Sequence, residues 1–237
     1  MGVQCRGDGT IRDLDRELPA AVVRRVLVVA TVVVCLVGLC AELARHLLGL
    51  GDSAAASILS LSFEGNLPTW YASVLPLICA GLLAWISAGE PRDRGHWRAL
   101  ALGFVAISID EVVGLHELLS PLIDTDGALH FGWVIPAGAL VIALGLAFLG
   151  FLRRLSPGTA RVFVLAGALY VTGAVVCDVP LGWWTVTHGE DGLGYALIDW
   201  CEETLEFTGL TIFASALLTR LTDQALRITP PRAAPTR

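Results

Sequence analysis

The amino-acid sequence predicts an all-α fold, a polytopic membrane bundle of six transmembrane helices with both termini in the cytoplasm. Three observations lead to this prediction. The chain is 55% hydrophobic and 16% charged, with a mean hydropathy of +0.69, unlike a soluble domain. Its apolar runs reach the roughly 20 residues that a bilayer crossing needs. Its arginines lie in alternate connections between those runs, as the positive-inside rule requires.

The expected elements follow the apolar runs in order. The six predicted spans are 24–47, 69–88, 98–119, 131–152, 160–179 and 194–219. Residues 1–23 precede them as a polar cytoplasmic segment, and residues 221–237 follow as a proline-rich cytoplasmic tail that we expect to be disordered. Residues 24–220 therefore form one transmembrane domain.

The basic residues set the predicted orientation. Arginines precede the first span, separate the second from the third and the fourth from the fifth, and follow the sixth. The connections 48–68, 120–130 and 180–193 contain neither arginine nor lysine, so we place them outside the cytoplasm. We expect a multi-pass protein of a bacterial inner (cytoplasmic) membrane, in contact with lipid. The net charge of −6 argues against nucleic acid as a partner.

Individual spans carry further signals. In the first span, Glu42 and Arg45 are three residues apart and predict a local ion pair. The second span begins at Pro68, and proline is tolerated in a first helical turn. The fourth span is uniformly apolar, with small residues that allow close helix packing. None of the six cysteines forms a C-x-x-C pair, so we expect them to pack as small hydrophobic side chains.

The sixth span differs from the others because it carries four acids. Asp199, Glu202, Glu203 and Glu206 fall within about a third of the helix circumference at 100° per residue. Carboxylates inside a membrane are costly, and they mark places where a cation, a proton path or water is met.

The third span repeats this theme. Asp110 and Glu117 are seven residues apart and would share one helical face, flanked by Glu111 and His116. The predicted orientation places these groups, like the acids of the sixth span, in the outer half of the bilayer. We therefore expect the two helices to face each other around a bound cation.

The expected ion is a divalent metal (Mn, Fe, Ca, Mg or Zn), because oxygen-rich ligands with one or two imidazoles suit these metals. A carboxylate-bridged metal site in a helical bundle is the nearest template, although the usual Glu-x-x-His pair is absent. The predicted metal ligands are Asp110, Glu117, Glu203, Glu206, Glu64 and Asp199. His116 and Glu202 are the predicted catalytic groups, which would move protons.

Three segments together carry a resemblance. They are E-x-N-x-P-T-W from Glu64 to Trp70, S-I-D-E-x4-H-E from Ser108 to Glu117, and E-E-x-x-E from Glu202 to Glu206. With them the chain resembles a family of uncharacterised bacterial six-span integral membrane proteins, over most of residues 25–220. The resemblance implies the topology and the site positions, and it implies no particular reaction.

Three functions remain open from the sequence, and the first is the one that we expect. The first is a membrane-embedded metalloenzyme acting on a lipid or another hydrophobic substrate. The second is a cation-coupled or proton-coupled transporter using the same acids, against which the apolar inner half of the spans counts. The third is a structural or sensory membrane protein stabilised by an ion. Tight stoichiometric metal would favour the enzyme, and a polar pathway through the inner half would favour transport.

Overall fold

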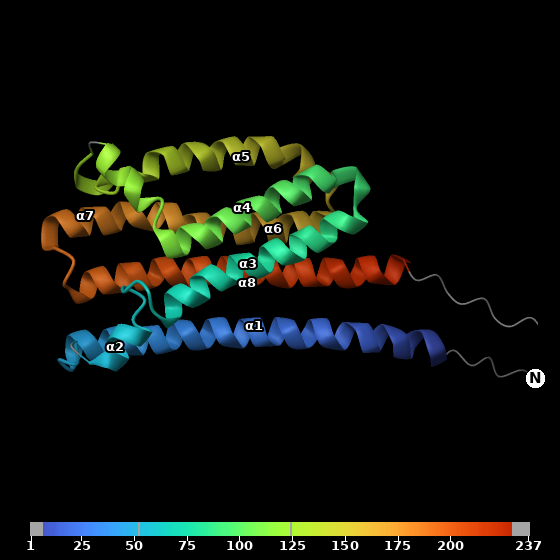
Figure 1. Ribbon diagram of the computed structural model, residues 1–237, viewed down its shortest axis with the longest axis horizontal. Coiled ribbons are helices and arrows are strands. Elements are labelled where there is room, and N and C mark those ends of the chain that lie inside the picture. The colour runs from blue at the N-terminus through green and yellow to red at the C-terminus, as the bar shows by residue number, and fades with distance from the viewer. Residues whose placement is uncertain (1–6, 52, 124, 229–237) are drawn as a thin grey trace, which may run out of the picture.

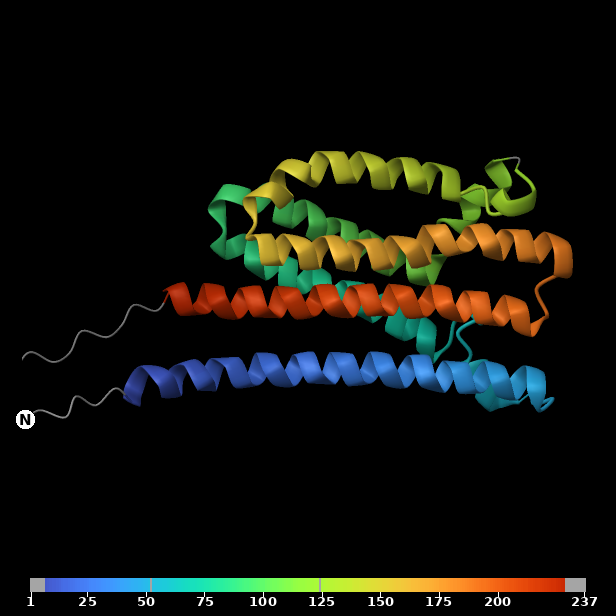
Figure 2. The ribbon, with the colours of Figure 1, turned by 180° about the vertical axis from the view of Figure 1, so that it is seen from behind.

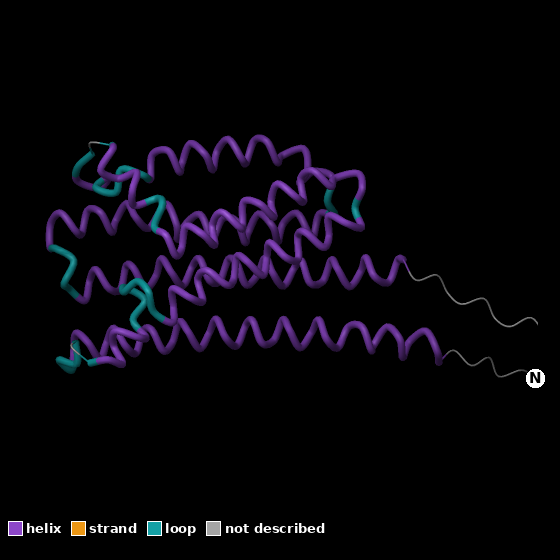
Figure 3. Tube along the Cα trace, in the orientation of Figure 1, coloured by secondary structure: helices purple, strands orange, loops and turns teal. Residues whose placement is uncertain are grey.

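The structure is a computed structural model that describes residues 7–51, 53–123 and 125–228. Throughout these ranges the regular structure is helical, with no strand, so the predicted all-α class is confirmed. Loops gather at the two ends of the bundle (Figure 3).

Long helical segments run side by side along the molecule (Figure 1). They are α1 (Gly7–Leu47), α3 (Leu67–Gly89), α4 (Arg94–Val113), α5 (Val134–Arg154), the consecutive α6 (Pro157–Val171), η4 (Thr172–Cys177) and α7 (Asp178–His188), and α8 (Leu193–Ile228). Shorter helices connect them: α2 (Ala54–Leu59), η1 (Pro91–Asp93), η2 (Glu117–Leu122) and η3 (Gly127–Leu129).

Four helical stretches are long and apolar enough to cross a membrane. They are Pro19–Leu47, Leu67–Gly89, Val134–Arg154 and Pro157–His188. The chain therefore has the character of a membrane protein. The acid-bearing α4 and α8 are not among these four, and they run alongside them in the bundle (Figure 1).

Helix α8 organises the packing. It contacts α1, α6 and α3, and it lies between α1 and α6 in both views of the ribbon (Figures 1 and 2). Helix α3 packs along α4, while α5 contacts α6 and η4 at the edge. The most deeply buried side chains lie where α3, α4, α5 and α8 meet, and include Leu75, Leu83, Trp97, Phe151, Phe207 and Leu217. Among the described cysteines all are free. Cys35 and Cys79 are buried as expected of small hydrophobic groups, whereas Cys40 and Cys201 are exposed.

The start of α1 and the end of α8 lie at the same end of the bundle (Figure 1), which we call the termini end; the opposite end is the far end. Ion pairs join connections at the termini end. Arg154 donates to the Asp93 carboxylate at 2.6 and 3.0 Å, and Arg220 donates to Glu90 at 2.7 Å. Hydrogen bonding from Arg154 lowers the pKa of Asp93 below its usual value.

Several predicted boundaries were wrong. The third span ends at Val113 rather than 119, because Gly114 adopts the left-handed conformation at φ +63° and donates its N–H to the Asp110 carbonyl at 2.7 Å. The helical segment that contains the fifth predicted span, 160–179, continues to His188 because α6, η4 and α7 follow one another without a break. Helix α1 begins at Gly7, and α8 continues to Ile228, so 221–228 is helical. The remainder of the predicted tail, 229–237, lies outside the described residues.

Candidate functional site

The far half of α8 packs tightly against the π-helical η4. A Cβ atom placed on Gly173 would lie 2.7 Å from the Glu202 carbonyl oxygen and 2.7 Å from the Glu206 Cγ. A Cβ on Gly209 would similarly lie 2.7 Å from the Ala166 carbonyl oxygen. Glycine at both positions lets the two backbones approach closely. A π-helical turn is rare and is often found at functional sites.

This packing brings acids from three elements together. The Glu206 carboxyl lies within electrostatic range of Glu111 of α4, Glu203 and Glu202 of α8, and Asp178 of α7. Glu202 is also in range of Asp199. We call these six residues the acid cluster: Glu111, Asp178, Asp199, Glu202, Glu203 and Glu206. Glu206 is buried, with 8% of its surface exposed.

Asp110 and His116 form a pair beside the acid cluster. The Asp110 carboxylate accepts the His116 backbone N–H at 3.0 Å, and its other oxygen lies 2.8 Å from His116 Nδ1. The left-handed turn at Gly114 folds the chain back to allow both contacts. The His116 ring lies 4.7 Å from that of Trp133, and Asp178 is within electrostatic range of His116. His116, which the sequence placed beside the face of Asp110, is thus brought directly onto the Asp110 carboxylate.

Asp199 connects the acid cluster to a buried polar group on α1. Glu42 is fully buried and accepts a hydrogen bond from Arg45 at 3.3 Å, which confirms the predicted local pair. Ser60 also donates to Glu42. Asp199 lies within electrostatic range of Glu42 and Arg45, so Arg45 is the arginine that faces this side of the acid cluster.

The acid cluster holds polar atoms that lack partners. Asp199 Oδ2 and Glu202 Oε2 are buried and make no hydrogen bond to any described residue. So many carboxyl groups cannot all ionise close together without a countercharge. The cluster therefore either carries protons or takes up a cation.

The structure brings some of the predicted site residues together and leaves others apart. Glu203, Glu206, Asp199 and Glu202 lie together in the acid cluster, with Asp110 and His116 at its edge. Glu64 is exposed on the connection before α3. Glu117 lies in η2, off the helix of Asp110, and its side chain is outside the described part of the chain. Within the described residues, no group of three His, Cys, Asp or Glu side chains is arranged to hold a metal ion.

Sequence reasoning left out two members of the acid cluster. Glu111 was treated only as a flanking residue, and Asp178 was not chosen as a site residue. The signal for Asp178 was available, since it is the single acid in an apolar run ending Val-Val-Cys-Asp. Tyr170 also faces the cluster, within electrostatic range of Glu206, Glu111 and Glu203.

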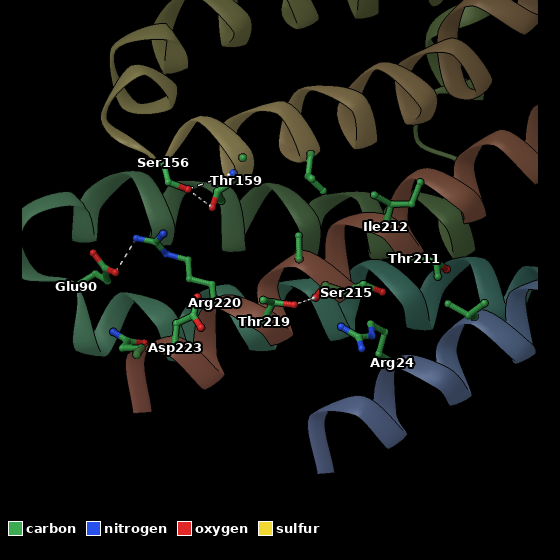
Figure 4. Close-up of a pocket in the computed structure, with 15 residues that line it drawn as sticks. Arg24, Glu90, Ser156, Thr159, Thr211, Ile212, Ser215, Thr219, Arg220 and Asp223 are labelled. Carbon is green, nitrogen blue, oxygen red and sulfur yellow. Dashed lines mark hydrogen bonds and ion pairs between the residues drawn. The ribbon is translucent and has the colours of Figure 1, made fainter. Parts of the chain in front are cut away.

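A half-open cavity of about 510 Å³, whose lining includes polar side chains among a larger apolar area, lies in the other half of the molecule, at the termini end. Figure 4 shows the residues that line it. Residues of α1, α6 and α8 line this termini-end cavity. Thr211, Ser215 and Thr219 of α8 share one face because they are four residues apart. Arg220 reaches from α8 to Glu90 across the cavity's end. The repeat of small hydroxyl residues along the sixth span was a recognisable signal that sequence reasoning missed.

No curated protein and no solved structure matches the chain at a significant level. One family model does match, over residues 26–221, and it is described as a domain of unknown function. On this match, which spans most of the bundle, the chain belongs to the DUF8692 family.

Proposed function

We propose that this protein is a six-span transporter of a bacterial inner membrane, with both termini in the cytoplasm, that couples transport to cation binding at the acid cluster. In this proposal α4 and α8 cross the bilayer beside the four apolar stretches. Helix α4 has 20 residues, which at 1.5 Å per residue span roughly 30 Å, the thickness of the hydrocarbon core.

The observation that carries the proposal is the termini-end cavity. The apolar inner half of the predicted spans counts against transport, yet this cavity supplies polar groups in that half. Its deepest α8 residue, Thr211, follows Glu206 by five residues, which is about 7.5 Å along a helix. The acid cluster and the cavity thus lie in succession along one helix, as two arms of a pathway would.

The chemistry of the acid cluster suits transient binding. Its acids come from α4, α7 and α8, so a bound cation would draw three elements together. Release of the cation would restore repulsion between the carboxylates and favour their separation. A site whose charge decides how helices pack can couple ion binding to a change in shape.

The metalloenzyme hypothesis requires a different kind of metal site. It needs a divalent ion held tightly by at least three converging ligands. Among the described residues no such group of three is arranged around one point. A divalent ion (Mn, Fe, Ca, Mg or Zn) remains a candidate for the transported or coupling cation.

Flux measurements on the full chain in proteoliposomes test the proposal. A pH-sensitive dye reports protons and a fluorescent chelator reports divalent ions, while elemental analysis of the purified protein measures tightly bound metal. We expect ion flux, lost in Glu203→Gln and retained in the matched control Glu64→Gln, because Glu64 is exposed outside the cluster. Stoichiometric metal without flux would instead support the enzyme, and the transport proposal would be wrong.

A further inference from the structure

The acid cluster and the termini-end cavity are separated by a short buried layer. This layer contains three hydroxyl groups, one each from α1, α3 and α8. The Thr31 hydroxyl oxygen lies 2.6 Å from the Tyr71 hydroxyl oxygen and 2.6 Å from Thr211 Oγ1. All three residues are buried, with 6%, 9% and 6% of their surfaces exposed. We call Thr31, Tyr71 and Thr211 the hydroxyl triad.

We infer that the coupling cation is the proton and that it passes between the acid cluster and the termini-end cavity through the hydroxyl triad. This inference rests on the proposed transport function, and it goes further because it names the ion and its route.

One end of the hydroxyl triad opens on the cavity. Thr211 is both a triad member and a cavity-lining residue. Ser215 and Thr219 continue the polar lining from Thr211 toward the termini end, one helical turn at a time. Ser215 Oγ is buried without a hydrogen-bond partner among the described residues, so it is free to bind a water or hydronium oxygen.

The other end of the triad approaches the acid cluster. Cys35 follows Thr31 by four residues and lies on the same face of α1. Its thiol is within electrostatic range of the Tyr71 hydroxyl and of Glu203. The Thr204 hydroxyl lies beside the Cys35 thiol. Thr204 Oγ1 is buried and makes no hydrogen bond of regular geometry to the thiol or to another described residue. In the inferred route the proton therefore passes from Tyr71 to the Glu203 carboxyl by way of Cys35 and Thr204.

Hydroxyl groups in a row can pass a proton without any net change in themselves. Each hydroxyl has one proton to donate and lone pairs to accept another. A hydronium ion in the cavity gives a proton to Thr211, Thr211 gives its own to Thr31, and Thr31 gives its own to Tyr71. The bridge of Cys35 and Thr204 relays the proton to a carboxylate of the cluster. Only O–H and S–H bonds form and break, and one positive charge moves.

The same geometry excludes metal ions from this route. A divalent ion needs about six oxygen ligands at roughly 2.0–2.6 Å. Thr31 Oγ1 lies 2.6 Å from each of the other two triad oxygens, so no metal ion fits within either hydrogen-bonded pair while the three residues stay in place. A proton needs only the hydrogen bonds.

The charged surroundings of the receiving carboxyl are acidic. The titratable groups within range of Glu203 come from α1, α4, α6 and α8, and are Cys35, Glu111, Tyr170, Asp199, Glu202 and Glu206. None of these six is basic. The basic groups beside the cluster are Arg45, within range of Asp199, and His116, within range of Asp178 and Glu111. The Glu203 side of the cluster therefore attracts a proton that arrives through the triad.

Proton flux in proteoliposomes, driven by a potassium diffusion potential and followed with an internal pH dye, tests the inference. We expect Thr31→Val and Thr211→Val to slow the flux at least tenfold, because valine keeps the shape and removes the hydroxyl. Thr31→Ser keeps a hydroxyl and should retain most of the rate. Thr222→Val is the matched control, since the hydrogen bond of the Thr222 hydroxyl within the described part of the chain goes to the Leu218 carbonyl of its own helix, 3.1 Å away.

The outcomes separate the two proposals. Unchanged proton flux in both valine variants overturns the triad route and leaves the transport function standing. Flux of a divalent ion without proton flux overturns the inference in the same way. If the wild-type protein moves neither protons nor divalent ions, both proposals fail. If a valine variant does not fold, the proton flux of Tyr71→Phe and Thr31→Ser is compared instead. Slow flux in Tyr71→Phe together with fast flux in Thr31→Ser supports the route, and any other pattern overturns it.

Discussion

The contact between Gly173 of η4 and the backbone of α8 allows a quantitative test of how the acid cluster is assembled. In Gly173→Ala, the new methyl group would lie 2.7 Å from the Glu202 carbonyl oxygen and 3.1 Å from the Glu206 backbone N. Both are backbone atoms, so neither can swing aside as the end of a side chain could. Forcing a methyl group into such packing costs about 1–3 kcal/mol.

Gly167→Ala is the matched control. It lies on α6, just before η4, and a Cβ there meets no atom within 4 Å. Both variants gain the same helix propensity, about 1 kcal/mol over glycine, so the difference between them isolates the clash. At roughly 2–4 °C per kcal/mol for a chain of this size, we expect Gly173→Ala to unfold about 2–12 °C below Gly167→Ala.

Thermal unfolding in detergent, followed by circular dichroism, measures this difference. Equal unfolding temperatures for the two variants would refute the close approach of η4 to α8, and with it the position assigned to Asp178 in the acid cluster. If only Gly173→Ala unfolds early, η4 packs against α8 as the structure has it.

Two further predictions concern ion pairs. Asp93→Asn should destabilise the protein by at most about 1 kcal/mol at pH 7, because the pair with Arg154 is partly exposed. Since the pKa of Asp93 is lowered in the folded state, this contribution is complete above the unfolded pKa and is lost as pH falls through the folded pKa. Thermal melts over a series of acidic pH values should show the difference between variant and wild type shrinking as the pH falls. Glu42→Ala should lower the free energy of unfolding, measured by chemical denaturation, by about 3–5 kcal/mol, because it leaves the largely buried Arg45 without its partner. The control Glu64→Ala, at an exposed site, should change the free energy of unfolding by less than about 0.5 kcal/mol. Equal losses in the two variants would contradict the buried pair.

The helices were largely predictable from the sequence because each depends on local patterns. Apolar runs of bilayer length marked the long helices. Closely spaced acids on one face of the sixth span indicated that Glu203 and Glu206 act together, and both lie in the acid cluster. These signals need only helical periodicity.

The rest of the site depends on departures from periodicity. Treating residues 98–119 as one helix put Glu117 on the face of Asp110, yet the left-handed residue Gly114 ends that helix. The Gly-Leu-His sequence after two valines was a C-cap signal. The π-helical η4, by contrast, arises where α6 meets α8, and no local pattern indicates which way it turns Asp178.

The widened turn of η4 has a mechanical consequence for the segment that follows it. A π-helical stretch accommodates an extra residue relative to an α-helix of the same length. If residues 172–177 tightened to regular α geometry, everything after them would turn by up to about 100° about the rod axis. Asp178 would then rotate away from Glu206, while α6 stayed packed against Gly209. The continuous segment α6–η4–α7 would in this way move the Asp178 carboxyl into and out of the acid cluster, with no hinge between domains.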